Sequence, residues 1–228
     1  MNALSKSMRF VFATKERGCN TLSILCTLYL KDGIILTSES RATHSIDANG
    51  KKIITGRTDD LQKTFAIDDK KIGISFCANA KVNTMLMDDF FEMFIRDHVK
   101  ADDTIETISE ILRIFFKDRG TQIVLAGYEN EVPYVYKIVG GVKKLLNRQD
   151  DTIKYGMEVR GLYEKTCEYF ENEIQPQIVF GNLTIEEGIG LAKKLIEYAI
   201  NNEEGCGGDI NILVIKPCSV TWWQKANY

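Results

Sequence analysis

The chain has 228 residues, of which 44% are hydrophobic and 27% are charged, so it is long enough for one large domain with a substantial buried core. Its formal net charge of -3 excludes a general electrostatic field for nucleic acid. The longest apolar runs have the length of β-strands, so no membrane span is expected.

A polar leader of about 20 residues precedes the first long apolar run. Its apolar patch, Phe10 to Ala13, is too short for the core of a secretory signal. The cysteines form no CxxC pair and have no metal-ligand spacing with His44 or His98, so we expect free thiols in a reducing cytoplasm and neither a metal nor a cofactor. The six cysteines are Cys19, Cys26, Cys77, Cys167, Cys206 and Cys218.

The first half of the domain predicts two β-hairpins. Two apolar runs surround Lys31-Asp32-Gly33, and Asp-Gly between apolar runs favours a tight turn. A polar stretch from Arg41 to Gln62 follows, with a turn signal at Asn49-Gly50. The segments "KTFAI" and "IGISFCA" then predict a second hairpin that turns over residues 68–71.

Two amphipathic helices are predicted next. Apolar residues at helical spacing occur over residues 80–98 and again over 104–117. Asp103, with Glu106 three residues later, is the expected N-terminal cap of the second helix.

The second half of the domain predicts three strands, two helices and two closing strands. Strands are predicted at "TQIVLAGYE" and "VPYVYKIVG", with a third short strand after Gly141. Helices are predicted over 160–172 and 184–202, the latter opening with a capping box between Thr184 and Glu187. The chain then closes with the strand "GGDINILVIK" and a short strand over 220–223.

Strands and helices therefore come in blocks: four strands, two helices, three strands, two helices and two strands. Such blocks argue against alternating βαβ units and predict an α+β fold of antiparallel sheets with helix pairs outside. Because no repeat or linker divides the chain, we expect a leader or propeptide over residues 1–20 and a single domain over 21–228.

With this order, "YLKDGIILTSESRAT" resembles the opening hairpin of proteasome β-type subunits and their bacterial relatives. The resemblance continues through "QKTFAIDDKKIGISFCANA" and reappears at "LTIEEGIGLAKKLIEYAI" and "GGDINILVIK". It implies the four-layer α-β-β-α sandwich of N-terminal-nucleophile (Ntn) hydrolases. In that class a hydroxyl or thiol is exposed at a new N-terminus, and the free α-amine serves as its base.

Three side chains near the end of the leader are candidates for this nucleophile. Counting back from Lys31-Asp32-Gly33 with the family's spacing reaches Ser23. Thr21 has the family's residue type but requires two extra residues in the first strand. Cys19 follows a glycine, as the family's nucleophile does, yet lies four residues too early. A junction that is never cut is a further alternative.

The resemblance also implies a charged pair beside the nucleophile. Glu39 matches the family's acidic position at the end of the second strand, and Lys63 matches its lysine. Lys51 and Lys52 compete for the lysine position, but only Lys63 has the right distance to "IGISFCA".

The chain departs from the family pattern at two places. Glu203 and Cys206 occur where the family has an acidic residue and a serine that support the nucleophile, and a thiol is a much weaker hydrogen-bonding group than a hydroxyl. The family's Ser-Gly-rich turn corresponds to "TIKYGMEVRG", where we identify only Gly156. The neighbouring Tyr155 is expected to block or reshape the site.

The resemblance implies a threonine- or serine-type peptidase that processes itself, acts on polypeptides and assembles with copies of itself or related subunits, possibly as a ring. The departures favour an alternative, a catalytically inactive structural subunit of the same fold. An amidase acting on a small amide is a third reading, with an altered pocket around Tyr155 as its signature. No nucleic acid or membrane partner is expected.

Overall fold

The computed structural model describes residues 23–48, 51–77, 81–82, 85–150, 152–161 and 164–226. In this part of the chain the fold is mixed α+β, with antiparallel sheets and four α-helices. The α+β class predicted from the sequence is confirmed.

The first large sheet has five antiparallel strands in the order β14-β1-β2-β15-β16. The predicted turn at Lys31-Asp32-Gly33 joins the neighbouring strands β1 and β2, and Leu30 N donates to Gly33 O at 2.9 Å. The strands are β1 (Ile24–Tyr29), β2 (Ile34–Glu39), β14 (Gly156–Gly161), β15 (Ile210–Lys216) and β16 (Ser219–Gln224).

The second large sheet also has five antiparallel strands, in the order β11-β10-β9-β6-β5. The predicted turn over residues 68–71 is confirmed, because a 3-10 turn over Asp68–Lys70 joins β5 to β6. A second turn joins β9 to β10 at Asn130 and Glu131, which both have positive φ. The strands are β5 (Thr64–Ile67), β6 (Ile72–Cys77), β9 (Gln122–Glu129), β10 (Val132–Val139) and β11 (Val142–Leu145).

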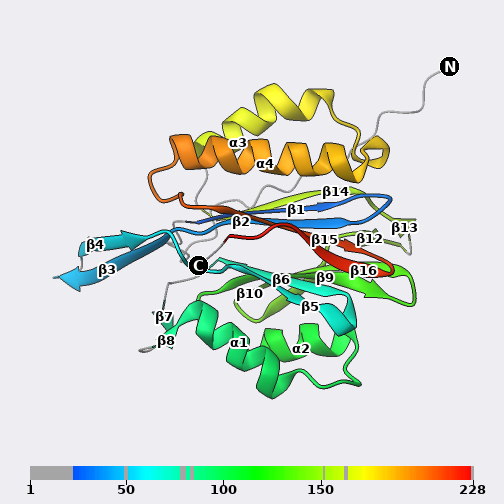
Figure 1. Ribbon diagram of the computed structural model, residues 1–228, viewed down its shortest axis with the longest axis horizontal. Coiled ribbons are helices and arrows are strands. Elements are labelled where there is room, and N and C mark those ends of the chain that lie inside the picture. The colour runs from blue at the N-terminus through cyan, green and yellow to red at the C-terminus, as the bar shows by residue number, and fades with distance from the viewer. Residues whose placement is uncertain are drawn as a thin grey trace.

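Helices cover the outer faces of both sheets (Figure 1). Helices α3 (Glu164–Tyr169) and α4 (Ile185–Asn202) lie over the first sheet, and α3 continues as a π-helical turn over Phe170–Ile174. Helices α1 (Met87–His98) and α2 (Ile105–Phe115) lie over the second sheet. The predicted capping box at Thr184 and Glu187 opens α4.

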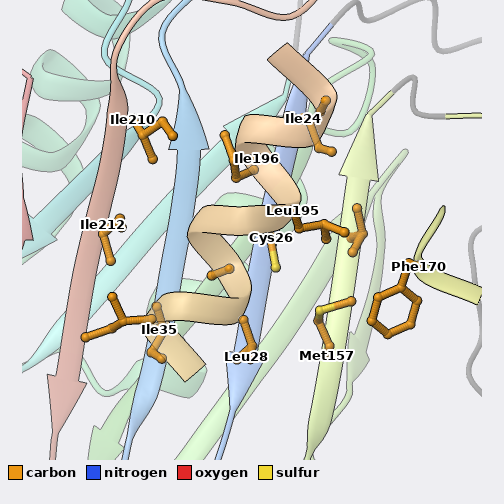
Figure 2. Packing of buried hydrophobic residues seen from close by; sticks show 14 of the residues in the cluster. Ile24, Cys26, Leu28, Ile35, Met157, Phe170, Leu195, Ile196, Ile210 and Ile212 are labelled. Atoms are coloured by element: carbon orange, nitrogen blue, oxygen red, sulfur yellow. The ribbon is translucent and has the colours of Figure 1, made fainter. Parts of the chain in front are cut away.

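Alternating side chains of the strands build three apolar clusters. On β1, Ile24, Cys26 and Leu28 contact the cluster beneath α3 and α4, because successive side chains of a strand point to opposite faces. A second cluster, which includes Leu36 and Leu213, joins the two sheets, and a third packs α1 and α2 on the second sheet. Figure 2 shows the first cluster, in which Leu195 and Ile196 of α4 lie over the strands.

A separate two-stranded hairpin extends from one end of the molecule (Figure 1). It consists of β3 (Ala42–Ala48) and β4 (Lys51–Thr58), and it occupies the stretch that the sequence analysis treated as polar with one turn signal. The remaining strands form short pairs of two residues each, Lys81–Val82 with Met85–Leu86 and Arg148–Gln149 with Thr152–Ile153.

Two predicted helix starts and one predicted helix cap were wrong. Helix α1 begins at Met87 rather than near residue 80, because Lys81–Val82 pairs with Met85–Leu86. The N-terminal cap of α2 is Thr104, whose hydroxyl accepts from Thr107 N, and not Asp103. The helix predicted from residue 160 begins at Glu164, because Gly156–Gly161 form β14.

No helix in the described ranges is long and apolar enough to cross a membrane.

The apolar cluster beneath α4 makes a testable contribution to stability. Ile196 is 0% exposed, so we expect Ile196→Ala to lower the free energy of unfolding by about 2–5 kcal/mol. The matched control is Ile114→Ala, at a helical position that is 63% exposed, which is expected to change it by less than about 0.5 kcal/mol. Urea denaturation measures both, and equal losses in the two variants would contradict this packing.

Candidate active site

The antiparallel order of the first sheet brings distant parts of the chain together at one end. Ile24 at the start of β1 pairs with Gly161 at the end of β14. Glu39 at the end of β2 pairs with Ile210 at the start of β15. Ser23 and the turn before β15 therefore lie at the same end of the sheet as the Glu39 carboxylate.

Lys63 approaches this end from the second sheet. It lies directly before β5, and its carbonyl accepts from Phe76 N of the neighbouring strand at 2.9 Å. Its side chain is 1% exposed and forms an ion pair with Glu39, which is 0% exposed. The pair thus joins one sheet to the other through buried charges.

The Lys63 ammonium uses all three of its hydrogen-bond donors. Nζ donates to Ser23 Oγ at 2.9 Å, to the main-chain oxygen of Arg41 at 2.6 Å, and to Glu39 Oε1. An ammonium group has three donors and no acceptor, so its hydrogen bonding is complete in this geometry. Lys63 is therefore held as a cation against the Ser23 hydroxyl.

The Glu39 carboxylate is also fully engaged. Oε1 accepts from Ile24 N at 3.3 Å as well as from Lys63, and Oε2 accepts from Arg41 N at 2.7 Å and Gly207 N at 3.3 Å. Burial raises the pKa of the Glu39 carboxyl above its ordinary value, and the charge and hydrogen bond of Lys63 partly oppose that rise. The carboxylate consequently depends on Lys63 for its charged form.

Gly161 allows β14 to approach Ser23. Its φ is +115°, and a Cβ at this position would lie 1.5 Å from Ser23 O. Only glycine satisfies both the conformation and the space. The same main-chain oxygen of Ser23 accepts from Cys77 Sγ at 3.9 Å.

Arg41 connects this cluster to the loop before Lys63. Its guanidinium contacts Asp59 through Nε–Oδ1 at 2.7 Å and Nη2–Oδ2 at 2.9 Å, and Nη1 donates to Cys206 O at 2.8 Å. The Arg41 hydrogen bond lowers the pKa of Asp59 below its ordinary value. From the sequence, Arg41 was given no functional role and Asp59 was not identified. No sequence signal links these two residues.

The two predicted supporting residues have different surroundings from those expected. The Glu203 carboxylate, at the end of α4, accepts from Thr166 N at 3.0 Å and from Thr166 Oγ1 at 3.3 Å. Cys206 is 1% exposed, and burial raises the pKa of its thiol. Its main chain, rather than its thiol, holds Arg41. Glu203 thus contributes to the packing of α3, and Cys206 has a neutral thiol near the charged pair.

The expected effect of Tyr155 on the site was wrong. Tyr155 precedes Gly156, which pairs with Tyr29 at the opposite end of β1 from Ser23. The glycine that meets Ser23 is Gly161, the last residue of the stretch "TIKYGMEVRG".

The structure thus brings Ser23, Glu39 and Lys63 together, three of the positions that the resemblance implied. Lys51 and Lys52 lie on β4, in the hairpin outside the two large sheets. Thr21 and Cys19 lie outside the described residues. In the described ranges, no group of three or more His, Cys, Asp or Glu residues is arranged to hold a metal ion.

No protein-family model matches the chain, and no curated protein matches its sequence.

Removing Lys63 tests how strongly the site depends on the buried pair. Lys63→Met leaves the Glu39 charge buried without its partner, so we expect the free energy of unfolding to fall by about 3–5 kcal/mol. Without Lys63 the pKa of Glu39 rises further above 4.5, so the folded state retains a proton that the unfolded state releases. The variant should therefore lose stability as the pH rises from about that value, which urea denaturation at several pH values measures.

Two further variants control this experiment. Lys193→Met removes a partly exposed lysine 3.8 Å from Glu197 and is expected to have little effect. Adding Glu39→Gln to Lys63→Met removes the unpaired charge and should recover part of the stability and flatten the pH dependence. A Lys63→Met protein as stable as the Lys193→Met protein at neutral pH would contradict a buried, mutually dependent pair.

Proposed function

We propose that the chain is a self-processing Ntn hydrolase similar to proteasome β-type subunits, with Ser23 as its nucleophile. The observation that carries this proposal is the 2.9 Å contact between Ser23 Oγ and a buried Lys63 that is itself ion-paired with Glu39. The two stacked five-stranded sheets with helix pairs outside support the four-layer α-β-β-α sandwich that the resemblance implies.

The proposed self-processing breaks the peptide bond between Leu22 and Ser23. Ser23 Oγ attacks the Leu22 carbonyl carbon, the C–N bond breaks, and the acyl group moves from the nitrogen to the oxygen as an ester. Water then cleaves the ester, which leaves a carboxylate on Leu22 and a free α-amine and hydroxyl on Ser23. A fixed cation beside the attacking oxygen lowers the cost of removing its proton.

In the processed enzyme, Lys63 and the α-amine have different tasks. Lys63 donates all three of its N–H groups, so as a cation it stabilises negative charge on Ser23 Oγ and accepts no proton. The α-amine of Ser23 has an unperturbed pKa of about 8 and serves as the general base. Attack on a substrate amide forms an ester on Ser23 that water then hydrolyses.

Ser23 is preferred over Thr21 because of its contacts. The Ser23 hydroxyl already contacts Lys63, and the next residue, Ile24, donates its N–H to Glu39. Ser23, which the family's spacing also selects, thus has the neighbours that this mechanism requires.

A catalytically inactive structural subunit of the same fold is the second candidate. It is favoured by Glu203, which accepts hydrogen bonds from Thr166, and by the neutral, buried thiol at Cys206. The amidase reading depended on Tyr155 near the site, and the position of Tyr155 at the far end of β14 leaves no observation in its favour.

The resemblance also suggests a polypeptide substrate and assembly with copies of the chain or related subunits. We include both in the proposal, together with a cytoplasmic location, which the free thiols of the five described cysteines support.

Intact mass of the purified protein tests the proposal. We expect loss of residues 1–22, because Ser23 is cleaved at its own N-terminal side. Ser23→Ala should retain the full mass, since it lacks the attacking oxygen, whereas Thr21→Ala should be processed normally. Ser23→Thr keeps a hydroxyl at this position and should also be processed.

A serine-reactive electrophile provides the second measurement. It should label the processed protein at Ser23 and leave Ser23→Ala unlabelled. A precursor that keeps its full mass and remains unlabelled would overturn the hydrolase proposal and leave the structural subunit. Processing that is lost in Thr21→Ala but kept in Ser23→Ala would identify Thr21 as the nucleophile instead.

A further inference from the structure

The hairpin of β3 and β4 has an ion pair at its base. Arg41 immediately precedes β3 and Asp59 immediately follows β4, so their bidentate contact closes the hairpin where it leaves the body (Figure 1). Two further bonds join the same segments, from Ser40 Oγ to Asp59 O at 2.8 Å and from Leu61 N to Ser40 O at 3.0 Å. The loop that leads to Lys63 is therefore attached to the end of β2.

The main chain of Arg41 contacts both charges of the candidate active site. Its carbonyl accepts from Lys63 Nζ at 2.6 Å, and its N–H donates to Glu39 Oε2 at 2.7 Å. A displacement of Arg41 would thus change an acceptor of Lys63 and a donor to Glu39 at once.

The side chain of Arg41 is held on two sides. Asp59 binds its guanidinium in a bidentate manner, and Cys206 O accepts from Nη1. The turn that follows Cys206 leaves space for the side chains of Arg41 and Ser40, because its residues Gly207 and Gly208 have no Cβ. A Cβ on Gly207 would lie 2.0 Å from Arg41 Cζ, and a Cβ on Gly208, whose φ is +72°, would lie 2.2 Å from Ser40 Oγ.

We propose that Asp59 is a positioning residue for Lys63, acting through Arg41. This inference rests on the proposed function, in which Lys63 acts on the Ser23 hydroxyl. Among the described residues, the Asp59 carboxylate binds the Arg41 guanidinium and not Ser23. It orients the Arg41 guanidinium, which fixes the Arg41 carbonyl, and that carbonyl fixes the third N–H of Lys63.

If the ion pair between Arg41 and Asp59 served stability alone, its loss would slow the reaction only in proportion to the loss of thermal stability. The Arg41 and Asp59 side chains are 25% and 46% exposed, and exposed pairs contribute little to global stability. A small displacement of a catalytic group can nevertheless slow a reaction by roughly a hundredfold. Loss of Asp59 should therefore slow the reaction far more than it lowers the melting temperature.

The experiment compares Asp59→Asn with Asp59→Glu and with a control pair. Asp97→Asn is the control, because Arg96 and Asp97 form a similar bidentate pair on α1, at 2.8 Å and 3.2 Å. The readout is the rate of loss of residues 1–22, followed by intact mass. We expect Asp59→Asn to slow processing by roughly tenfold to a hundredfold, Asp59→Glu to restore most of the rate, and Asp97→Asn to match the unmodified chain.

A second readout does not depend on catalysis. Acetic anhydride labels accessible lysines, and mass spectrometry gives the rate at each one. We expect Lys63, 1% exposed in the unmodified chain, to react several-fold faster in Asp59→Asn, whereas Lys143, far from Asp59 in the sequence and 18% exposed, should react at an unchanged rate.

The two readouts separate the possible failures. If the unmodified chain is never processed, the proposed function fails and the labelling of Lys63 alone decides the role of Asp59. If Asp59→Asn leaves Lys63 as protected as before, the positioning role is overturned. It is also overturned if the processing rate falls only in proportion to thermal stability, or if Asp59→Glu fails to restore the rate.

Discussion

The buried ion pair between Glu39 and Lys63 is the constraint on which the arrangement of this site depends. The two side chains are 0% and 1% exposed, and removing two charges from water costs more than their attraction returns unless other hydrogen bonds complete the geometry. Those bonds come from Ile24 N, Arg41 N and Gly207 N to the carboxylate, and from the ammonium to Ser23 and Arg41 O. Two charges thus fix segments that are far apart in the chain.

The same pair explains why the two sheets meet where they do at this end. Glu39 ends β2 of the first sheet and Lys63 precedes β5 of the second, while the cluster that includes Leu36 and Leu213 holds the sheets together farther along. Apolar contacts fix the distance between the sheets but are non-directional. The ion pair and its hydrogen bonds supply the direction, and they aim the ammonium at the Ser23 hydroxyl.

Glu39, Lys63 and Ser23 could be named from the sequence because they lie in or near short motifs that resemble those of proteasome β-type subunits, and such motifs are local signals. Sequence reasoning missed Asp59 and Gly161, whose importance arises from contacts across the chain. It also predicted a helix from about residue 160, whereas Glu158 and Arg160 belong to β14. In the structure both charges are buried as an ion pair on β14, so pairing with β1 overrode the local pattern.

The departures from the family pattern carry less weight in the structure than they do in the sequence. At Cys206 the contribution to the site is a main-chain oxygen that accepts from Arg41, and a main-chain oxygen does not depend on whether the side chain is a thiol or a hydroxyl. The stretch that corresponds to the family's Ser-Gly-rich turn places a glycine, Gly161, against Ser23, but it contains no serine. Two departures remain: that stretch has no serine, and the hydrogen bonds of Glu203 to Thr166 hold α3 instead of the nucleophile. The case for catalysis therefore depends on whether Lys63, Glu39 and the new α-amine suffice without a second acid, and not on the thiol.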